Sequence, residues 1–249
     1  MSVPKISVAV ATFNGEKYIK DQIDSILSQL DENAEIIVSD DSSTDKTIDI
    51  LHSFNDARIK VFFNSENKGP IFNFENALKR TSGDIIFLSD QDDIWLPEKI
   101  STTKKYLEEY DLVVSDCKVV DEDLRVLYDS MYARHNSGKG VYKNLVSNTY
   151  LGCCMAFNKK LLELALPFPK KIPMHDIWLG FIAGIFFSPV FIPDKLVIYR
   201  RHEKNTTSTA SKSEYSFYRK ILFRINTLIY LPLLATRKFF SKSGRAGKG

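Results

Sequence analysis

Several features that define other protein classes are scarce or missing in this chain of 249 residues. Its three cysteines, Cys117, Cys153 and Cys154, are odd in number and lack the spacing of metal ligands, which argues against a disulfide framework and a zinc site. The N-terminal stretch MSVPKISVAVATFNG has no basic start and no small-residue cleavage site, so we expect a strand there and not a signal peptide. These absences favour a reducing, cytoplasmic setting.

Charge divides the sequence into a body and a tail. Residues 212–249 contain nine Lys or Arg and one acid, whereas residues 1–211 contain 25 Lys or Arg and 30 acids. The longest uncharged run of the tail, 225–236, has 12 residues, well short of the roughly 20 needed to span a bilayer. We therefore expect the tail to lie in the interface of an anionic membrane. The alternatives are a helix docked on its own domain or on a partner. Nucleic acid is not an expected partner, because the body shows no matching basic surface.

Short apolar runs alternate with amphipathic stretches along the body. Strands that are apolar almost throughout are typical of a parallel sheet covered by helices on both faces, so we expect a doubly wound α/β fold. No linker divides the body, which predicts one α/β domain over residues 1–211 followed by the tail over 212–249. The periodicity predicts strands at 6–11, 35–39, 59–63, 85–88 and 112–115, and helices at 16–30, 45–54, 72–80 and 97–109. The second half is less regular, with a hairpin or loop at 119–140, a strand at 149–157, a helix at 174–187 and short strands at 190–192 and 196–199.

Polar or acidic residues follow each of the first four expected strands, in the stretches ATFNG, SDDSSTD, NSENKGP and SDQDD. In open α/β sheets, ligands bind beyond the carboxyl ends of the strands. If the strands are parallel, these four loops share one edge of the sheet. Asp41 should then approach Asp90 and Asp92.

The stretch SDQDDIW crowds three carboxylates, which must be solvated, protonated or bridged by a cation. No GxGxxG loop or P-loop is present to cradle phosphates. Mg²⁺ or Mn²⁺ held by carboxylates can instead take up the charge of a diphosphate. The alternative is an acidic cap for the next helix, which explains Asp93 but leaves Asp90 and Asp92 without a role.

Ordered motifs over about residues 4–202 resemble the family 2 glycosyltransferases with the GT-A fold. They are VAVATFNG, IIVSDDSSTDKT, NKGPIFNFENAL, FLSDQDDIWLPEKI, MHDIWL and YRRHEKNTTS. The resemblance implies a mostly parallel GT-A sheet with helices on both faces. It also implies a nucleotide-sugar donor, a divalent metal (Mn²⁺ or Mg²⁺) and inversion at the anomeric carbon.

The resemblance also implies roles for individual residues. Asp41 corresponds to the aspartate that contacts the base, and Asp90 and Asp92 match the DxD pair, with Asp92 as the direct metal ligand. Asp176 falls at the position of the catalytic base, although it could be a helix N-cap, and His202 falls where a histidine faces the metal or diphosphate. Further candidates for the nucleotide are Thr12, Asn14, Lys68 and Asn73, and candidates near the donor or acceptor sugar are Gly152, His175 and Trp178.

Within the family, SDQDDIWLP, MHDIWL and YRRHE look most like bacterial enzymes of surface-polysaccharide synthesis, such as O-antigen or capsule. These include rhamnosyltransferases and transferases of glucose or galactose. The resemblance implies a dTDP- or UDP-linked donor, a lipid-diphosphate-linked saccharide acceptor and a peripheral position at the inner face of the cell membrane. A sugar transfer that needs one base and one metal also fits these residue types. No pair of carboxylates in the sequence stands out as the two that a glycosidase needs. A non-catalytic nucleotide-sugar or cation-binding module, and a nucleotidyltransferase or phosphoryltransferase on a similar sheet, remain as alternatives.

Overall fold

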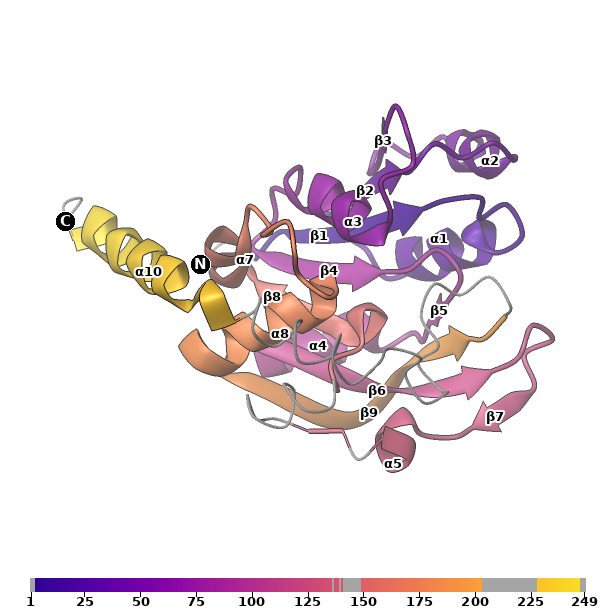
Figure 1. Ribbon diagram of the computed structural model, residues 1–249. Coiled ribbons are helices and arrows are strands. Elements are labelled where there is room, and N and C mark those ends of the chain that lie inside the picture. The colour runs from indigo at the N-terminus through magenta and orange to yellow at the C-terminus, as the bar shows by residue number, and fades with distance from the viewer. Residues whose placement is uncertain (1–2, 136, 139, 141–148, 203–227, 247–249) are drawn as a thin grey trace.

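The structure is a computed structural model that describes residues 3–135, 137–138, 140, 149–202 and 228–246. Within these residues, the centre is a nine-stranded sheet whose main path runs in the order β3-β2-β1-β4-β8-β6-β9-β5, with β7 paired to β6 (Figure 1).

The first half is the parallel α/β unit that the hydrophobic pattern predicts. The strands β1, β2, β3 and β4 are parallel to one another and are connected by helices. The predicted strands and helices are all present, with ends shifted by a few residues. Their bounds are β1 Ile6–Thr12, α1 Ile19–Leu27, β2 Glu35–Asp40, α2 Thr47–Ser53, β3 Ile59–Phe63, α3 Pro70–Leu78 and β4 Ile85–Ser89.

The second half adds antiparallel strands. β8 lies between β4 and β6 and is antiparallel to both, whereas β9 is parallel to β6. Six strands of the sheet therefore point the same way, which confirms the expectation of a mostly parallel sheet. The bounds are β5 Ile94–Trp95, α4 Lys99–Leu107, β6 Leu112–Val120, β7 Val126–Tyr128, α5 Met131–His135, the 3-10 turn η1 Gly152–Cys154, β8 Met155–Asn158, α7 Lys159–Ala165, α8 His175–Phe186, β9 Pro189–Arg200 and α10 Leu231–Ala246.

Two details of the second half differ from the sequence prediction. The expected strand at 149–157 is strand only from Met155, because η1 precedes it. The two short strands at 190–192 and 196–199 form the single strand β9, whose pairing register with β6 shifts around Pro193 and Asp194. Proline has no amide hydrogen to donate, so an irregularity at this point lets the strand continue.

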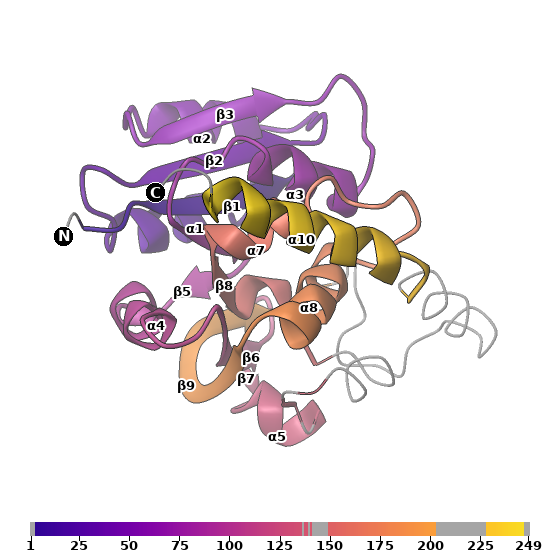
Figure 2. The same ribbon diagram turned by 90° about the vertical axis from the view of Figure 1, so that its left-hand side faces the viewer.

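Helices cover both faces of the sheet. Figure 2 shows α1, α2 and α4 on one face and α3 and α8 on the other. The central strands β1, β2, β4, β6 and β8 are almost fully buried, and in β2 every residue is buried. This explains why β2 shows no alternation of polar and apolar residues.

The described part of the tail, 228–246, contains the helix α10 and packs on the domain. Leu234 is fully buried, and the ring of Tyr230 lies edge-on to that of Trp178, with 6.0 Å between centroids. Arg237 donates a hydrogen bond to the carbonyl oxygen of Leu166 at 3.2 Å. In Figure 1, α10 extends past α7, away from the edge at which β1 and β4 end. Within the described residues, no helix combines the length and apolarity needed to cross a membrane.

Candidate functional site

The predicted site loops meet at the carboxyl edge of the parallel strands. Thr12 ends β1, and its carbonyl oxygen accepts the amide of Asp41, which follows β2, at 2.9 Å. The next residue, Phe13, exchanges two hydrogen bonds with the side chain of Gln91, which follows β4. Gly15 permits this approach, because a Cβ there would lie 2.3 Å from Oε1 of Gln91. The end of β1 therefore ties the two acidic loops to one edge, as the sequence predicts.

The turn after β2 is held by Asp40. Its carboxylate accepts hydrogen bonds from the hydroxyl of Thr12 at 2.7 Å and from the amide and hydroxyl of Ser43 at 2.8 and 2.6 Å. Asn14 braces the same turn, because its side-chain oxygen accepts the amide of Thr44 at 2.8 Å. The predicted nucleotide residues Thr12 and Asn14 thus use their side chains within the protein.

Asp41 is buried and anchors the loop between β3 and α3. Its carboxylate accepts the amides of Lys68 and Gly69, at 3.0 and 2.7 Å, and the side-chain amide of Asn64 at 3.0 Å. Asn73 is also internally bonded, since its amide donates to the carbonyl oxygen of Thr12 at 3.0 Å. The structure thus gathers the predicted nucleotide residues at the ends of β1 and β2, where their hydrogen bonds shape the loop.

In the turn after β4, by contrast, the carboxylates crowd one another. Burial and the carboxylates of Asp92 and Asp176 raise the pKa of Asp90 to about 8. These three carboxylates therefore converge, although Asp176 comes from α8. The pKa of Asp93 is raised well above its usual range by burial and by Asp92 and Asp90. Repulsion among carboxylates out of water disfavours their charged forms.

Asp93 does not cap the helix that follows it, so that expectation is wrong. The helix α4 begins at Lys99, and its N-cap residue is Glu98, which makes no side-chain capping bond. Asp93 instead is fully buried and accepts the amide of Arg200, in β9, at 3.1 Å. The expectation failed because β5 intervenes between the acidic turn and α4.

Asp92 and His202, far apart in the chain, are in contact. The Nε2 atom of His202 lies 2.8 Å from Oδ2 of Asp92. The imidazole also stacks on Tyr18, with ring centroids 4.9 Å apart, and the Arg200 guanidinium lies 4.4 Å from the same tyrosine ring. The predicted metal ligands Asp92 and His202 therefore lie together and offer carboxylate oxygens and an imidazole nitrogen as donor atoms.

Asp176 lies at the start of α8. The N-cap of α8 is Met174, so Asp176 is the second residue of the helix and not its N-cap. Its Oδ1 accepts the amide of Ile177 at 2.6 Å. Gly152 faces this point, because a Cβ there would lie 3.0 Å from Nε2 of His175 and 3.7 Å from Cβ of Asp176. The predicted base and its glycine neighbour are thus brought together.

The two aromatic candidates for sugar contact are buried. Trp178 is fully buried and its indole donates to the carbonyl oxygen of Ala165 at 3.1 Å, so it is not available to stack on a sugar. His175 stacks on Phe74 with centroids 3.9 Å apart, and burial lowers its pKa to about 3. At neutral pH His175 is therefore uncharged.

Sequence reasoning missed several residues around the acidic turn. Tyr18 supports His202, and buried Lys99 donates to the carbonyl oxygen of Cys153 at 3.0 Å. Asp90, Asp93 and Cys153 each place one donor atom within 4.8 Å of the others. No local sequence pattern predicts these contacts, because each joins residues from separate elements.

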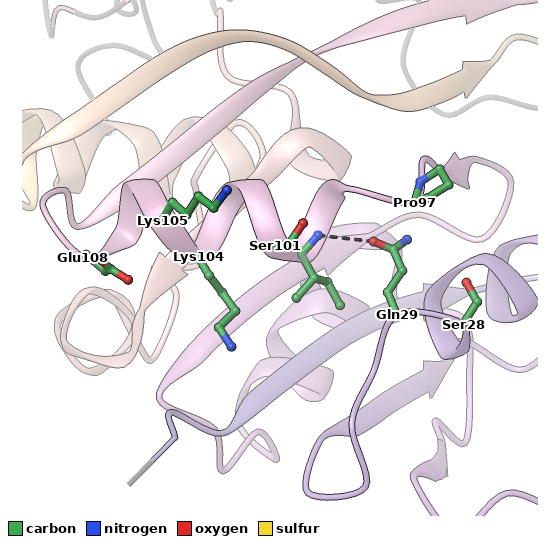
Figure 3. Close-up of a pocket in the computed structure, with 8 residues that line it drawn as sticks. Ser28, Gln29, Pro97, Ser101, Lys104, Lys105 and Glu108 are labelled. Carbon is green, nitrogen blue, oxygen red and sulfur yellow. Dashed lines mark hydrogen bonds between the residues drawn. The ribbon is translucent and has the colours of Figure 1, made fainter. Parts of the chain in front are cut away.

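A groove between α1 and α4 lies apart from these residues (Figure 3). Its volume is about 460 Å³, and the amide of Ile100 donates to Oε1 of Gln29 at its wall, at 3.3 Å. None of the predicted site residues lines it. The lining residues are Ser28, Gln29, Pro97, Ile100, Ser101, Lys104, Lys105 and Glu108.

Comparison with known proteins decides the family. A profile described as Glycosyl transferase family 2 matches residues 7–165, more than half of the chain. The chain belongs to glycosyl transferase family 2. The resemblance stated from the motifs is thereby confirmed.

Two curated relatives of this glycosyltransferase illustrate the family. The putative teichuronic acid biosynthesis glycosyltransferase TuaG of Bacillus subtilis (strain 168) is 26% identical over 234 residues, 88% of either chain. The GalNAc(5)-diNAcBac-PP-undecaprenol beta-1,3-glucosyltransferase of Campylobacter jejuni is 36% identical over 146 residues, which are 57% of this chain and 45% of that protein.

Two solved structures share the fold. S. aureus TarS 1–349 in complex with UDP-GlcNAc matches 90% of this chain and 66% of its own, with a TM-score of 0.71 and 22% identity. The mannosyltransferase PcManGT from Pyrobaculum calidifontis, in complex with GDP-Man and Mn²⁺, matches 100% of this chain and 77% of its own, with a TM-score of 0.62 and 18% identity. The expected GT-A fold is confirmed.

Proposed function

We propose that this glycosyltransferase moves a sugar from a nucleoside-diphosphate donor to a hydroxyl of a lipid-diphosphate-linked saccharide, with inversion. One observation supports the proposal: the carboxylate of Asp176 is close enough to that of Asp90 to help raise its pKa, so the candidate base lies near one of the candidate metal ligands. A single displacement needs both, a base for the incoming hydroxyl and an electrophile for the departing diphosphate.

The proposed metal is Mn²⁺ or Mg²⁺. Asp92 and His202 would hold it, with Asp90 beside them, because carboxylate oxygens suit both ions and the imidazole nitrogen favours Mn²⁺ over Mg²⁺. When bound, the metal offsets the negative charge that develops on the leaving diphosphate. The Mn²⁺ in the PcManGT complex supports this choice.

Asp176 is the proposed general base. Its carboxylate would take the proton of the acceptor hydroxyl while that oxygen bonds to the anomeric carbon and the bond to the diphosphate oxygen breaks. Because the hydroxyl attacks the face opposite the leaving group, the anomeric configuration inverts. Asp41 would contact the base of the nucleotide, with Thr12, Asn14, Lys68 and Asn73 around it, and Gly152 and His175 would border the sugar.

The proposed donor carries UDP or dTDP, and the sugar is a hexose or rhamnose. UDP-GlcNAc in the TarS complex supports a uridine nucleotide. The printed activity of the Campylobacter jejuni relative, on an undecaprenol-linked saccharide, supports a lipid-diphosphate acceptor in a surface polysaccharide such as O-antigen or capsule.

We also propose that residues 212–249 bind an anionic membrane surface. The packing of α10 on the domain uses Leu234, whereas Leu228, Ile229 and Leu233 are exposed. No acid lies between 228 and 246, so the helix suits anionic headgroups. One face of α10 would dock on the domain while the other meets lipid.

A donor screen tests the reaction. Wild type with Mn²⁺ and a lipid-diphosphate saccharide should release nucleoside diphosphate from one donor, whereas a nucleotidyltransferase would release pyrophosphate. Asp176→Asn should lower turnover by about 10²- to 10⁴-fold, the usual contribution of a general base. Equal rates for Asp176→Asn and wild type would contradict the proposed mechanism.

Vesicle binding tests the tail. Replacing Leu228, Ile229 and Leu233 by serine should weaken binding to anionic vesicles without changing the buried Leu234 contact. Unchanged binding in this variant and after removal of residues 212–249 would refute the role of the tail.

A further inference from the structure

Three atoms that could bind a metal ion lie close together near the candidate metal ligands. Asp90, Asp93 and Cys153 each contribute one atom, and all three atoms lie within 4.8 Å of one another. The set shares Asp90 with the proposed Mn²⁺ or Mg²⁺ site but includes neither Asp92 nor His202. It therefore has a different donor chemistry.

One oxygen of the Asp93 carboxylate is poorly satisfied. The side chain is fully buried, and its Oδ1 accepts the amide of Arg200 at 3.1 Å. Among the residues that the structure describes, its Oδ2 has no partner with good hydrogen-bond geometry, and the polar side chain beside the carboxylate is the Cys153 thiol. A buried carboxylate oxygen without a partner costs free energy, which a bound cation removes.

Cys153 is held rigidly beside it. The residue is fully buried in η1, and its carbonyl oxygen accepts Nζ of Lys99 at 3.0 Å. The following amide, of Cys154, donates to the carbonyl oxygen of Leu151 at 3.0 Å. The thiol therefore keeps its place relative to the two carboxylates, as a ligand must.

We propose that Asp90, Asp93 and Cys153 form a binding site for a thiophilic divalent cation of the Zn²⁺ or Cd²⁺ class. Two oxygens and one sulfur, with a fourth position open, match the three protein ligands of an open tetrahedral zinc site. Sulfur selects these ions against Mg²⁺ and Mn²⁺, which prefer oxygen ligands. The half-buried Asp90 gives access from the sheet edge. The ammonium of Lys99 opposes the cation, so the site should bind more weakly than a structural zinc centre.

A functional consequence follows if the proposed reaction is correct. Because Asp90 serves both sites, Zn²⁺ should compete with Mn²⁺ and inhibit transfer. This consequence rests on the proposed function, whereas cation binding itself does not.

Cadmium titration of the full chain tests the site without any donor. Wild type should take up one Cd²⁺ and develop the ultraviolet charge-transfer band of a thiolate–cadmium bond. Cys153→Ser should lose the band and weaken Cd²⁺ binding by at least the roughly 10- to 100-fold that loss of a merely supporting residue costs. Asp93→Asn should weaken binding while leaving the thiol in place.

Cys117 supplies the matched control. Cys117→Ser removes an equally buried thiol and should keep both the band and the affinity, whereas Cys154 is unsuitable because its side chain is hydrogen-bonded to that of Cys153. Thermal unfolding of each variant checks that it is folded. A band that persists in Cys153→Ser, or that is absent from wild type, would overturn the proposed site. Cd²⁺ binding through Cys153 in a protein that turns over no donor would instead contradict the proposed function and leave the site standing.

Discussion

Two acidic turns lie at the same edge of the sheet and differ in how their charges are satisfied. After β2, Asp40 and Asp41 accept hydrogen bonds from amides, hydroxyls and a side-chain amide. After β4, burial and neighbouring carboxylates raise the pKa values of Asp90 and Asp93. The first turn satisfies its charges with donors of the protein itself, whereas the second requires protons or a cation. A run of aspartates is therefore not by itself a metal site.

The largest expected effect contrasts one aspartate from each turn. Asp92→Asn should lower Mn²⁺ affinity by at least about 10- to 100-fold, because it removes a proposed ligand. Asp40→Ala should leave Mn²⁺ affinity unchanged but lower the free energy of unfolding by about 3 kcal/mol, because Thr12 and Ser43 lose a buried charged acceptor. Electron paramagnetic resonance of Mn²⁺ and urea denaturation measure the two quantities. If Asp92→Asn and Asp40→Ala changed Mn²⁺ affinity and the free energy of unfolding in the same way, the two turns would not differ in how their charges are satisfied.

A smaller effect is expected at Tyr18, a positioning residue that stacks on His202. Tyr18→Leu removes the aromatic face and should weaken Mn²⁺ binding about tenfold, as loss of a supporting residue around a metal does. Tyr18→Phe keeps the ring and serves as the control. If both variants bind Mn²⁺ as wild type does, the stacking does not position His202.

The acidic turn after β4 also predicts how stability depends on pH. The pKa of Asp90 rises from 3.8 to about 8 on folding, so the folded state binds this proton more tightly than the unfolded state. Its contribution to stability is full below pH 3.8 and is lost as pH rises through 8. Metal-free protein should therefore show a Tm that falls over this window. The fall should be smaller in Asp90→Asn and in wild type with Mn²⁺, and an identical fall in all three would contradict the assignment.

The smallest effect is expected at Ser42, in the turn after β2. Its φ of 67° lies in the left-handed region, where a side chain costs about 1 kcal/mol or more relative to glycine. The Ser42 hydroxyl offsets part of this cost by donating to the carbonyl oxygen of Asn64 at 2.9 Å. Ser42→Ala and Ser42→Gly both lose that bond, but we expect Ser42→Ala to be less stable by about 1 kcal/mol. Equal stabilities in urea denaturation would show that this backbone conformation carries no strain.

Sequence reasoning was most accurate where local pattern and topology agree. The apolar runs at 6–11, 35–39 and 85–88 predicted strands, and their parallel order placed the polar loops at one edge. It was least accurate after residue 90. β5, η1 and α7 were missed, because short or buried segments show no clear periodicity. The odd number of cysteines argued against a metal site. That number does not indicate which carboxylates lie next to Cys153 in the fold.

The sequence by itself determined the alternation of strands and helices, and with it the sheet edge that carries Asp41, Asp90 and Asp92. Hydrophobic periodicity and connection topology are enough for that. Only the tertiary structure decided which aspartates find donors, that His202 meets Asp92, and that Cys153 lies beside Asp93. Those contacts depend on β8 entering the sheet beside β4 and on β9 pairing with β5 and β6. Burial then removes the water that would otherwise solvate the crowded carboxylates, and local sequence does not encode this.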